Sequence, residues 1–448
     1  MMSNRGPRIK LAVCEEPLTS NGGFVVLSDL WDALGVSGLI DEHLPQPGSG
    51  RGFAPSVMVR SIVTVLHNGG EHLSDVSKIA KDPVLLASYG LKKFPASNTL
   101  TEWLGRCERW VRHSHGGGLE NVTLQGVEEV NRKLLGILAR KLNKKSLTLD
   151  IDASIVKTGK STARITYKNY RGYQPQLGYL AELRTFVASE FRNGDEPSSK
   201  DVVPYLQRCK AGMPEGTSIG VVRADAAYYQ RDVLKWCKNN GSDFVIRAYR
   251  DSGVMPAVYK IPEADWKPYF DSDGIEQSDT EVASGYHSMD GTGWFRLAVL
   301  RRRREKGEQY DLFDGKYSYF PIATSMKCSA QQVVHFYNQR GRIEDGIGQL
   351  KQDFGLSSMP CSDTKANAVW IAIGMLAFTL FVLLKSLVLG GGWVVRKAKT
   401  VRQHFVSVPG KLVRHARQVT LKLRCSPEFV RFLDQRRKRC RELAAELG

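Results

Sequence analysis

The sequence lacks the short motifs that mark several common classes of enzyme. Its eight cysteines include no CxxC pair, and its nine histidines include no HExxH or similar ligand spacing, so a zinc site is not indicated. It also contains no GxxxxGK[ST] loop, which argues against the use of ATP. Scattered cysteines without a signal peptide predict a reduced, cytoplasmic compartment with free thiols.

Acidic residues are the scarcer of the two charged classes. The 448 residues include 46 Asp and Glu against 64 Lys and Arg, which gives a net charge of +18 at pH 7. Such an excess favours a polyanionic partner, most often nucleic acid, with an anionic membrane surface as the second possibility. A hydrophobic content of 42% is typical of a globular protein, and the length suffices for two or three domains with their own cores.

Residues 1–140 contain several short stretches that predict capped helices. Ser28, Ser56 and Ser74 each precede an apolar pattern of helical period, and Thr99 with Glu102 has the spacing of a capping box. Short capped helices in a basic chain are typical of a helix-turn-helix-like DNA-binding region. A helical scaffold without a DNA contact explains the same pattern, and this segment alone does not separate the two.

The pattern changes near residue 146 and predicts an α/β core over 141–244 and 326–395. The stretch SLTLDIDAS alternates between apolar and polar residues, which indicates a strand with Asp150 and Asp152 on one face. A second strand is predicted to end just before Asp225. Sites in α/β folds are built at such strand ends, so these aspartates are candidates for chemistry.

Two further regions complete the predicted organisation. Residues 245–325 are rich in strand-like stretches and turns, which predicts a β-rich insertion; the run Arg301 to Arg304 on it is either solvated or in contact with phosphates. Residues 396–448 contain fifteen Lys and Arg against four Asp and Glu. We expect this C-terminal region to be ordered and to lie on a phosphate backbone, with a solvated basic face as the alternative.

A very apolar run covers residues 366–389. Its charge-free part is about as long as a minimal membrane span. A central helix buried against a sheet explains the same run, and it fits the basic, DNA-like character of the remaining chain better.

The stretch YNQRGRIEDGIGQLKQDFG gathers four polar side chains on one predicted helix. At about 100° per residue, Tyr337, Arg340, Glu344 and Lys351 fall on an arc of roughly 60°. Apolar residues form a neighbouring stripe that is expected to pack on a core. Ordinary charge pairs on a solvated face are the alternative interpretation.

Three carboxylate positions on rigid elements now stand out, namely Asp152 (or Asp150), Asp225 and Glu344. Two Mg²⁺ ions held by such a trio would activate an attacking oxygen and neutralise a leaving oxygen in phosphodiester chemistry. Spacing alone is weak support, because a chain with 46 acidic residues offers many such trios.

Four stretches resemble one family. LDIDAS resembles a first-strand motif in which the catalytic Asp is followed by any residue and then Ser or Thr. VVRADAAYYQRDVLKWCKNNGSDFVIR resembles the segment around the second Asp, and the stretch from Tyr337 fits the signature Tyr-x₂-Arg-x₃-Glu-x₆-Lys without gaps. GGEHLSDVSKIAKDP and FPASNTLTEWL resemble a leading domain. Together they resemble the DDE transposases of bacterial insertion sequences, in particular transposase DDE domain group 1, over nearly the whole chain.

This resemblance assigns roles to individual residues. It implies a ribonuclease-H-like core in which Asp152, Asp225 and Glu344 are the catalytic, metal-binding residues, with Asp150 as the rival of Asp152. It implies contacts with phosphates at the transposon end for Tyr337, Arg340 and Lys351. The spacing of 119 positions from Asp225 to Glu344 is typical of family members with a β-rich insertion there. Ala227 stands where related motifs often have Gly, which leaves the local turn open.

The resemblance also implies an activity. The protein is expected to bind terminal inverted repeats, to cleave DNA with two Mg²⁺ ions (Mn²⁺ can substitute) and to join the 3′-OH ends to target DNA. Expected partners are transposon-end and target DNA and a second copy in a synaptic complex, with neither ATP nor a membrane, in a bacterial cytoplasm at the nucleoid. The alternatives are a domesticated DNA-binding protein without cleavage and a structure-specific nuclease of the same fold.

Overall fold

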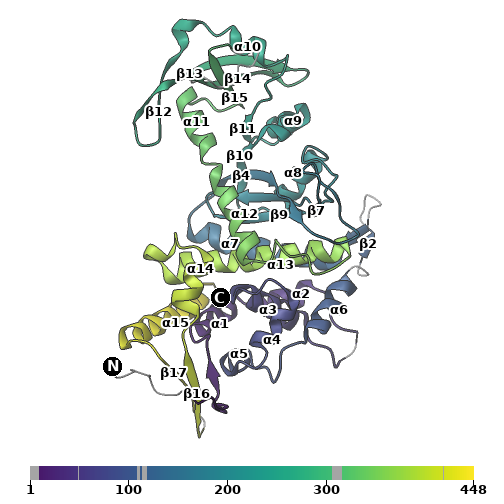
Figure 1. Ribbon diagram of the computed structural model, residues 1–448, viewed down its shortest axis with the longest axis vertical. Helices are drawn as coiled ribbons and strands as arrows, with labels where there is room; N and C mark the ends of the chain where they lie inside the picture. Colours follow the sequence, from purple (N-terminus) through teal and green to yellow (C-terminus); the bar gives the residue numbers. More distant parts are fainter. Residues whose placement is uncertain are drawn as a thin grey trace, which may run out of the picture.

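The computed structural model describes residues 10–48, 50–107, 111–113, 119–304, 315–416 and 418–447 of the chain. Its centre is a nine-stranded mixed sheet with the strand order β12-β13-β14-β15-β11-β10-β4-β8-β9. Helices pack along this sheet, and the N-terminal helices form a further layer at one end of the molecule (Figure 1). The α/β fold class expected from the sequence is therefore confirmed.

One half of the sheet contains both parallel and antiparallel neighbours. Its strands are β4 (Ser146–Ala153), β8 (Gln176–Leu180), β9 (Thr185–Glu190), β10 (Ser218–Ala224) and β11 (Asp243–Arg247). β4 is parallel to β10 and antiparallel to β8, and β10 is parallel to β11. The alternating sequence predicted β4 correctly. All residues from Leu147 to Ile151 are buried, however, so its polar face does not lie in solvent.

The other half of the sheet is the β-rich region expected between residues 245 and 325. It consists of β12 (Lys267–Phe270), β13 (Glu276–Met289), β14 (Gly293–Arg303) and β15 (Tyr317–Thr324), all antiparallel to their neighbours. Because β15 pairs with β11, this region continues the central sheet. Arg301 is buried and forms ion pairs with Glu263 and Glu281 at 2.5 and 2.7 Å, so the expectation of a solvated or phosphate-contacting residue is wrong for Arg301.

Helices pack on both faces of the sheet. Their bounds are α8 (Val202–Ala211), α9 (Arg231–Asn239), α11 (Ala330–Asn338) and α12 (Gly341–Asp353). A side chain at Gly178 of β8 would meet Cys209 and Tyr205 of α8. A side chain at Gly346 of α12 would lie 3.0 Å from the ring of the next β8 residue, Tyr179. Since successive residues of a strand point to opposite faces, α8 and α12 pack on opposite sides of the sheet.

The stretch from Tyr337 to Gly355 is two helices and not the single helix that its pattern predicts. α11 ends at Asn338 and α12 begins at Gly341. Between them, Arg340 N donates to Tyr337 O at 2.9 Å and Ile343 N donates to Arg340 O at 3.0 Å, the i to i+3 spacing of a tighter turn. Gly341 has a low helix propensity and lies at this junction. The predicted apolar stripe is nevertheless buried along α12.

Helices form most of residues 24–107, but three predicted caps are wrong. Ser74 lies inside the 3₁₀ turn Leu73–Asp75, and the helix that follows begins after Asp75. α1 (Phe24–Ala33) begins before Ser28, whose hydroxyl accepts a hydrogen bond from Arg60 at 2.8 Å and is thus a tertiary contact. α6 (Ser97–Cys107) begins before Thr99, two residues after the turn-forming Pro95. α3 (Pro55–His67) agrees with the predicted start near Ser56.

The apolar run after residue 364 forms the central helix of the protein. α13 (Thr364–Leu383) packs between α7 (Val122–Lys141) and the N-terminal helices (Figure 1). Thr379 of α13 donates to Asn131 at 2.7 Å, and Ala377 O lies 2.8 Å from His67 Nε2. By length and composition Thr364–Leu389 is the one helix of the described residues that could cross a membrane, yet 83% of its most apolar window is buried inside the protein. The fold uses it as a core helix.

The two ends of the chain pack together. β1 (Leu18–Thr19) pairs with β16 (Gly410–His415), which pairs with β17 (Gln418–Leu423). Arg437 of α15 (Pro427–Leu447) donates to Asp29 of α1 at 2.7 Å. The basic C-terminal region is therefore ordered, as expected, and joined to the N-terminal helices. The division of the chain into domains stays a prediction.

The remaining elements are short. They are α2 (Val36–His43), α4 (Val76–Ile79), α5 (Pro83–Ser88), α10 (Met255–Tyr259), α14 (Ala398–Val401), β2 (Val111–His113), β3 (Leu119–Asn121), β5 (Val156–Lys157), β6 (Arg164–Ile165) and β7 (Arg171–Tyr173), with 3₁₀ turns at Leu73–Asp75, Ala226–Tyr228, Glu263–Asp265 and Gly391–Trp393 and π-helical turns at Leu384–Leu389 and Arg402–Val406.

Candidate active site

The three candidate carboxylates come from three elements that meet at one edge of the sheet. Asp152 is the penultimate residue of β4, and Asp225 directly follows β10. These strands are parallel neighbours in which Ile151 pairs with Ala224, so the two aspartates lie side by side in register. Glu344 is in the first turn of α12.

Arg340 lies at the centre of this group. Its Nη2 is 2.9 Å from Asp152 Oδ2 and 3.8 Å from Asp225 Oδ2, and its Nη1 donates to Glu344 Oε1 at 3.1 Å. A single guanidinium thus bridges all three carboxylates. The residues that the sequence selected on separate grounds are brought together around one positive centre.

Arg340 keeps donors that no group of the described residues accepts. The side chain is buried, and its Nε and Nη2 have no hydrogen-bond acceptor within the described residues. The contact of Nη2 with Asp152 is therefore an ion pair without hydrogen-bond alignment. A buried guanidinium donor without an acceptor destabilises the fold unless another group accepts its hydrogen bond. A phosphate oxygen is the kind of acceptor that such a fork binds well.

Asp150, the rival of Asp152, has a different environment. Its carboxylate is fully buried and accepts two hydrogen bonds from Arg223 of β10, at 2.5 and 2.8 Å. Arg223 is also buried, and it donates further to the backbone oxygen of Phe336. Both oxygens of Asp150 are thus engaged by a structural partner, whereas Asp152 is about one-fifth exposed at the edge of the sheet. Asp152 is therefore the more accessible of the two carboxylates.

Tyr337 and Lys351 lie near the carboxylates, because the charges of Asp225 and Glu344 act on Tyr337 and the charge of Asp152 acts on Lys351. Tyr337 is half-buried at the end of α11, and burial raises the pKa of its hydroxyl. Lys351 donates to the backbone oxygen of Ile155, just beyond β4, at 2.8 Å, and burial lowers the pKa of its amine. Lys351 is therefore held beside the strand that carries Asp152, with one of its donors already used.

The carboxyl of Asp152 is electrostatically perturbed. Burial raises its pKa to about 6, and the neighbouring charges of Asp225 and Glu344 act in the same direction, while Arg340 opposes them. Negative charges that lie close together in a partly buried site repel one another, so the site favours the binding of a cation.

Replacing Asp152 by Asn should stabilise the protein at neutral pH. Because the folded pKa of about 6 lies above the ordinary value of 3.8, the wild-type carboxyl stabilises the fold fully below about pH 4, and this contribution is lost as the pH rises through about 6. We expect Asp152→Asn to unfold several degrees higher than the wild type at pH 8 and at the same temperature near pH 4. Thermal unfolding at the two pH values tests this, and a difference that does not change with pH would contradict it.

The site fits a divalent cation by its donor chemistry. Carboxylate oxygens are the ligands that Mg²⁺ prefers, and here three of them already surround a positive group. Within the described ranges, no group of three or more His, Cys, Asp or Glu is arranged as a preformed metal site. The side chain of Arg340 stands between the carboxylates and would have to move for them to share an ion.

Comparison with known proteins decides the family. A family model described as transposase DDE domain group 1 matches residues 2–443 of this chain. The chain belongs to the transposase DDE domain group 1 family. Membership in a DDE transposase family implies DNA cleavage and transfer, and transposases of this kind generally use divalent metal ions. The resemblance drawn from the sequence motifs is confirmed.

Two further comparisons assign no additional property to this transposase. A cryo-EM structure of the piggyBac transposase synaptic complex with hairpin DNA is similar at 11% identity and a TM-score of 0.47, over 86% of this chain and 79% of that chain. No curated protein sequence matches the chain.

The sequence motifs missed other residues of this transposase that lie near the site. Arg223 lies inside the stretch that resembles the segment around the second Asp, but that pattern assigned it no contact, and only its pairing with Asp150 shows what it binds. Arg247 ends β11, the parallel neighbour of β10, and its charge acts on Tyr337. Tyr249 lies two residues further along, and burial, together with the charge of Asp225, raises the pKa of its hydroxyl. The rule that selected Asp225, a polar residue at the end of a parallel strand, would also have selected Arg247.

Proposed function

We propose that this transposase binds the terminal inverted repeats of an insertion sequence, cleaves DNA by two-metal-ion phosphodiester hydrolysis, and joins the 3′-OH ends to target DNA. One observation carries the proposal: Asp152, Asp225 and Glu344, from two parallel strands and a helix, lie within 2.9 to 3.8 Å of one guanidinium. Carboxylates arranged around one centre on rigid elements are what metal-assisted phosphodiester chemistry requires.

The strand arrangement supports a ribonuclease-H-like core. The strands β9, β8 and β4 are antiparallel neighbours, and β10 and β11 continue from β4 in parallel. The first candidate carboxylate lies on the central strand of this set, and the second lies at the end of its parallel neighbour. In this proposal β12 to β15 are the insertion, placed between the second aspartate and the glutamate.

Asp152, Asp225 and Glu344 would hold the ions, with Mg²⁺ as the expected metal and Mn²⁺ as a substitute. When bound, the metal supplies activation of the attacking oxygen and neutralisation of the leaving oxygen. Asp225 is oriented for this role, because its other carboxylate oxygen accepts from Ala227 N at 2.9 Å and fixes the side chain at the strand end. The Ala at position 227 therefore does not prevent the turn.

The neighbouring cations and the phenol of Tyr337 would position DNA phosphates. Arg340 has two buried donors to offer, and Lys351 lies within reach of the same edge of β4. A phosphate that accepts from Arg340 would draw its guanidinium away from the carboxylates, so DNA and metal would favour each other at the site. Fixing the scissile phosphate in this way lowers the entropic cost of reaching the transition state.

Regions outside the candidate active site would bind the DNA partners. The helical N-terminal region and the basic C-terminal region pack together and would bind the terminal repeats as one body. Paired ends require at least a homodimer on DNA. Direct exchange of phosphodiester bonds requires no ATP. The net charge of +18 suits a protein at the nucleoid of a bacterial cytoplasm, without a membrane role.

Arg340→Gln should bind Mn²⁺ more tightly than the wild type in the absence of DNA. Removing a cation that competes for the same carboxylates is expected to raise the affinity by about tenfold, or roughly 1.4 kcal/mol. Electron paramagnetic resonance of free Mn²⁺ measures this without any cleavage assay. Arg342→Gln removes an exposed charge from the same helix and is the matched control. An unchanged or weaker affinity in Arg340→Gln alone would show that the guanidinium does not compete with metal.

An assay for strand joining tests the proposed function. The protein is incubated with Mg²⁺, linear DNA that carries the element's own terminal repeats, and a supercoiled target plasmid. We expect nicks at the repeat boundary and products in which the freed ends are joined to the plasmid. Cut ends that are released and never joined would identify a nuclease of the same fold. Binding of the repeats without any cutting would identify a domesticated DNA-binding protein.

A further inference from the structure

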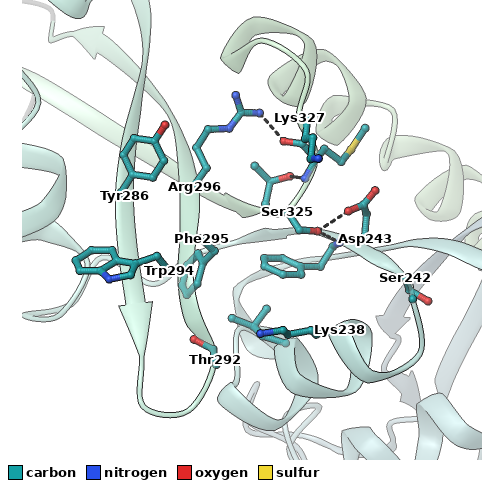
Figure 2. Close-up of a pocket in the computed structure, with 15 residues that line it drawn as sticks. Lys238, Ser242, Asp243, Tyr286, Thr292, Trp294, Phe295, Arg296, Ser325 and Lys327 are labelled. Atoms are coloured by element: carbon teal, nitrogen blue, oxygen red, sulfur yellow. Dashed lines mark hydrogen bonds between the residues drawn. The ribbon is translucent and has the colours of Figure 1, made fainter.

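A groove on the β-rich half of the sheet has the composition of a second nucleic-acid site. It has a volume of about 760 Å³ and lies between the β13–β14 hairpin, the end of α9 and the turn after β15. Figure 2 shows Tyr286 and Trp294 on one side of it and Lys238 and Lys327 on the other. The candidate carboxylates do not line it.

Two large aromatic side chains of this groove are exposed. Trp294 is 78% exposed and Tyr286 is 65% exposed. The next residue after Trp294, Phe295, is 8% exposed and packs against Phe244 and Tyr229, because successive residues of β14 point to opposite faces. The strand thus supplies one aromatic ring to the core and presents the other to solvent. Exposed aromatic clusters of this kind mark interaction sites.

Positive charges accompany these rings. Arg296 lies directly opposite Tyr286 in the β13–β14 pairing and two residues from Trp294, so the three side chains share one face of the hairpin. Lys238 and Lys327 line the same groove. The one carboxylate in the lining, Asp243, accepts a hydrogen bond from Ser325 at 2.7 Å. The groove therefore has an excess of cations.

The groove is distinct from the candidate active site. Asp243 begins β11 and pairs with Val221, which lies four residues before Asp225 along β10. At about 3.3 Å per residue, the two ends of this strand pair are roughly 13 Å apart. The groove lies at the edge of the sheet opposite to the one where the carboxylates meet.

We infer that this groove binds unpaired nucleotides of a DNA strand, with bases stacked on Trp294 and Tyr286 and phosphates on Lys238, Arg296 and Lys327. Aromatic rings beside cations are the combination that binds single strands. In a duplex the base faces are stacked on one another and are closed to an indole, so the exposed rings favour unpaired bases. A peptide of acidic residues would use the cations but leave the rings without a function. The inference rests on the proposed function for the source of the strand.

Fluorescence anisotropy of labelled oligo(dT) in EDTA, with the full-length protein, tests the site. Trp294→Ala should lower the affinity by about tenfold, because a base loses its stacking partner, and Trp294→Phe should retain most of the affinity. Phe270→Ala, which removes a partly exposed ring elsewhere on the sheet, should leave binding unchanged. The slope of log affinity against log salt concentration reports the number of phosphate contacts. Lys238→Ala and Lys327→Ala should each lower this slope by the amount of about one contact. Lys267→Ala, which removes an exposed lysine elsewhere, should leave the slope unchanged.

The outcomes separate this inference from the proposed function. Wild-type binding of oligo(dT) that Trp294→Ala and Tyr286→Ala leave unchanged would overturn the inference even if the enzyme cuts and joins transposon ends. Failure of the wild type to bind oligo(dT) would also overturn it. Binding that depends on Trp294 in a protein that never cuts would support the groove and contradict the proposed chemistry. Thermal unfolding verifies that each variant is folded, which the exposure of Trp294 leads us to expect.

Discussion

Glu344→Gln should bind transposon-end DNA as the wild type does and cut it at least about a thousandfold more slowly. The change keeps the shape of the side chain and its position in α12 but removes the charge that faces Arg340 at 3.1 Å. Loss of a ligand that stabilises the charged transition state is worth several kcal/mol, and about 4 kcal/mol corresponds to a thousandfold in rate. Asp152→Asn and Asp225→Asn should have effects of the same order.

Asp345→Asn is the matched control for these variants. Asp345 is the next residue of the same helix, but its carboxylate is exposed and pairs with Lys397 at 2.7 Å. We expect this variant to cut at the wild-type rate. A gel assay of nicking with Mg²⁺, together with a binding assay in EDTA, measures both quantities. Comparable loss of cutting in Glu344→Gln and Asp345→Asn would mean that the helix as a whole, and not Glu344, is required.

Asp150→Ala should destabilise the protein by about 3–5 kcal/mol. The substitution leaves Arg223 buried without its partner, and a buried charge that loses its counter-ion costs this amount. Replacing both residues at once, as Asp150→Leu with Arg223→Met, should recover most of the loss because no buried charge remains. Unfolding in urea at neutral pH gives the midpoints of all three proteins.

The same variants separate the roles of the two aspartates on β4. The double variant keeps Asp152 and should therefore retain metal-dependent cutting when it is folded. Asp152→Asn should show the opposite behaviour, with a stable fold and no cutting. A stable Asp150→Asn protein that cannot cut would instead make Asp150 the metal ligand and Asp152 its neighbour.

The sequence was sufficient to select the carboxylates but not to describe their surroundings. Asp152, Asp225 and Glu344 were selected by strand alternation, by a strand end and by a helical signature, and the fold brings them together. The bridge made by Arg340 could not be predicted, because it depends on the distance between α12 and two strands far away in the chain. The pairing of Asp150 with Arg223 depends on the register of β4 and β10, which no local pattern specifies.

Element types were easier to predict than their ends. β4 and α13 were predicted from patterns of apolar residues. Such patterns reflect burial, and burial extends over the whole length of these elements. Helix starts depend on single contacts: Ser28 bonds Arg60 instead of capping α1. The chain breaks into α11 and α12 at Gly341, a residue of low helix propensity. The helical pattern of the sequence did not reveal this break.

The most direct test of the central claim, that Asp152, Asp225 and Glu344 form one metal site once Arg340 is drawn to DNA, is an anomalous diffraction map. Crystals of the protein with DNA carrying the terminal repeat would be grown in Mn²⁺. We predict two peaks roughly 4 Å apart, held by oxygens of Asp152, Asp225 and Glu344 at about 2.2 Å, with the Arg340 guanidinium moved to a phosphate. A map without manganese at these residues, in which Arg340 still bridges the carboxylates beside bound DNA, would contradict the claim.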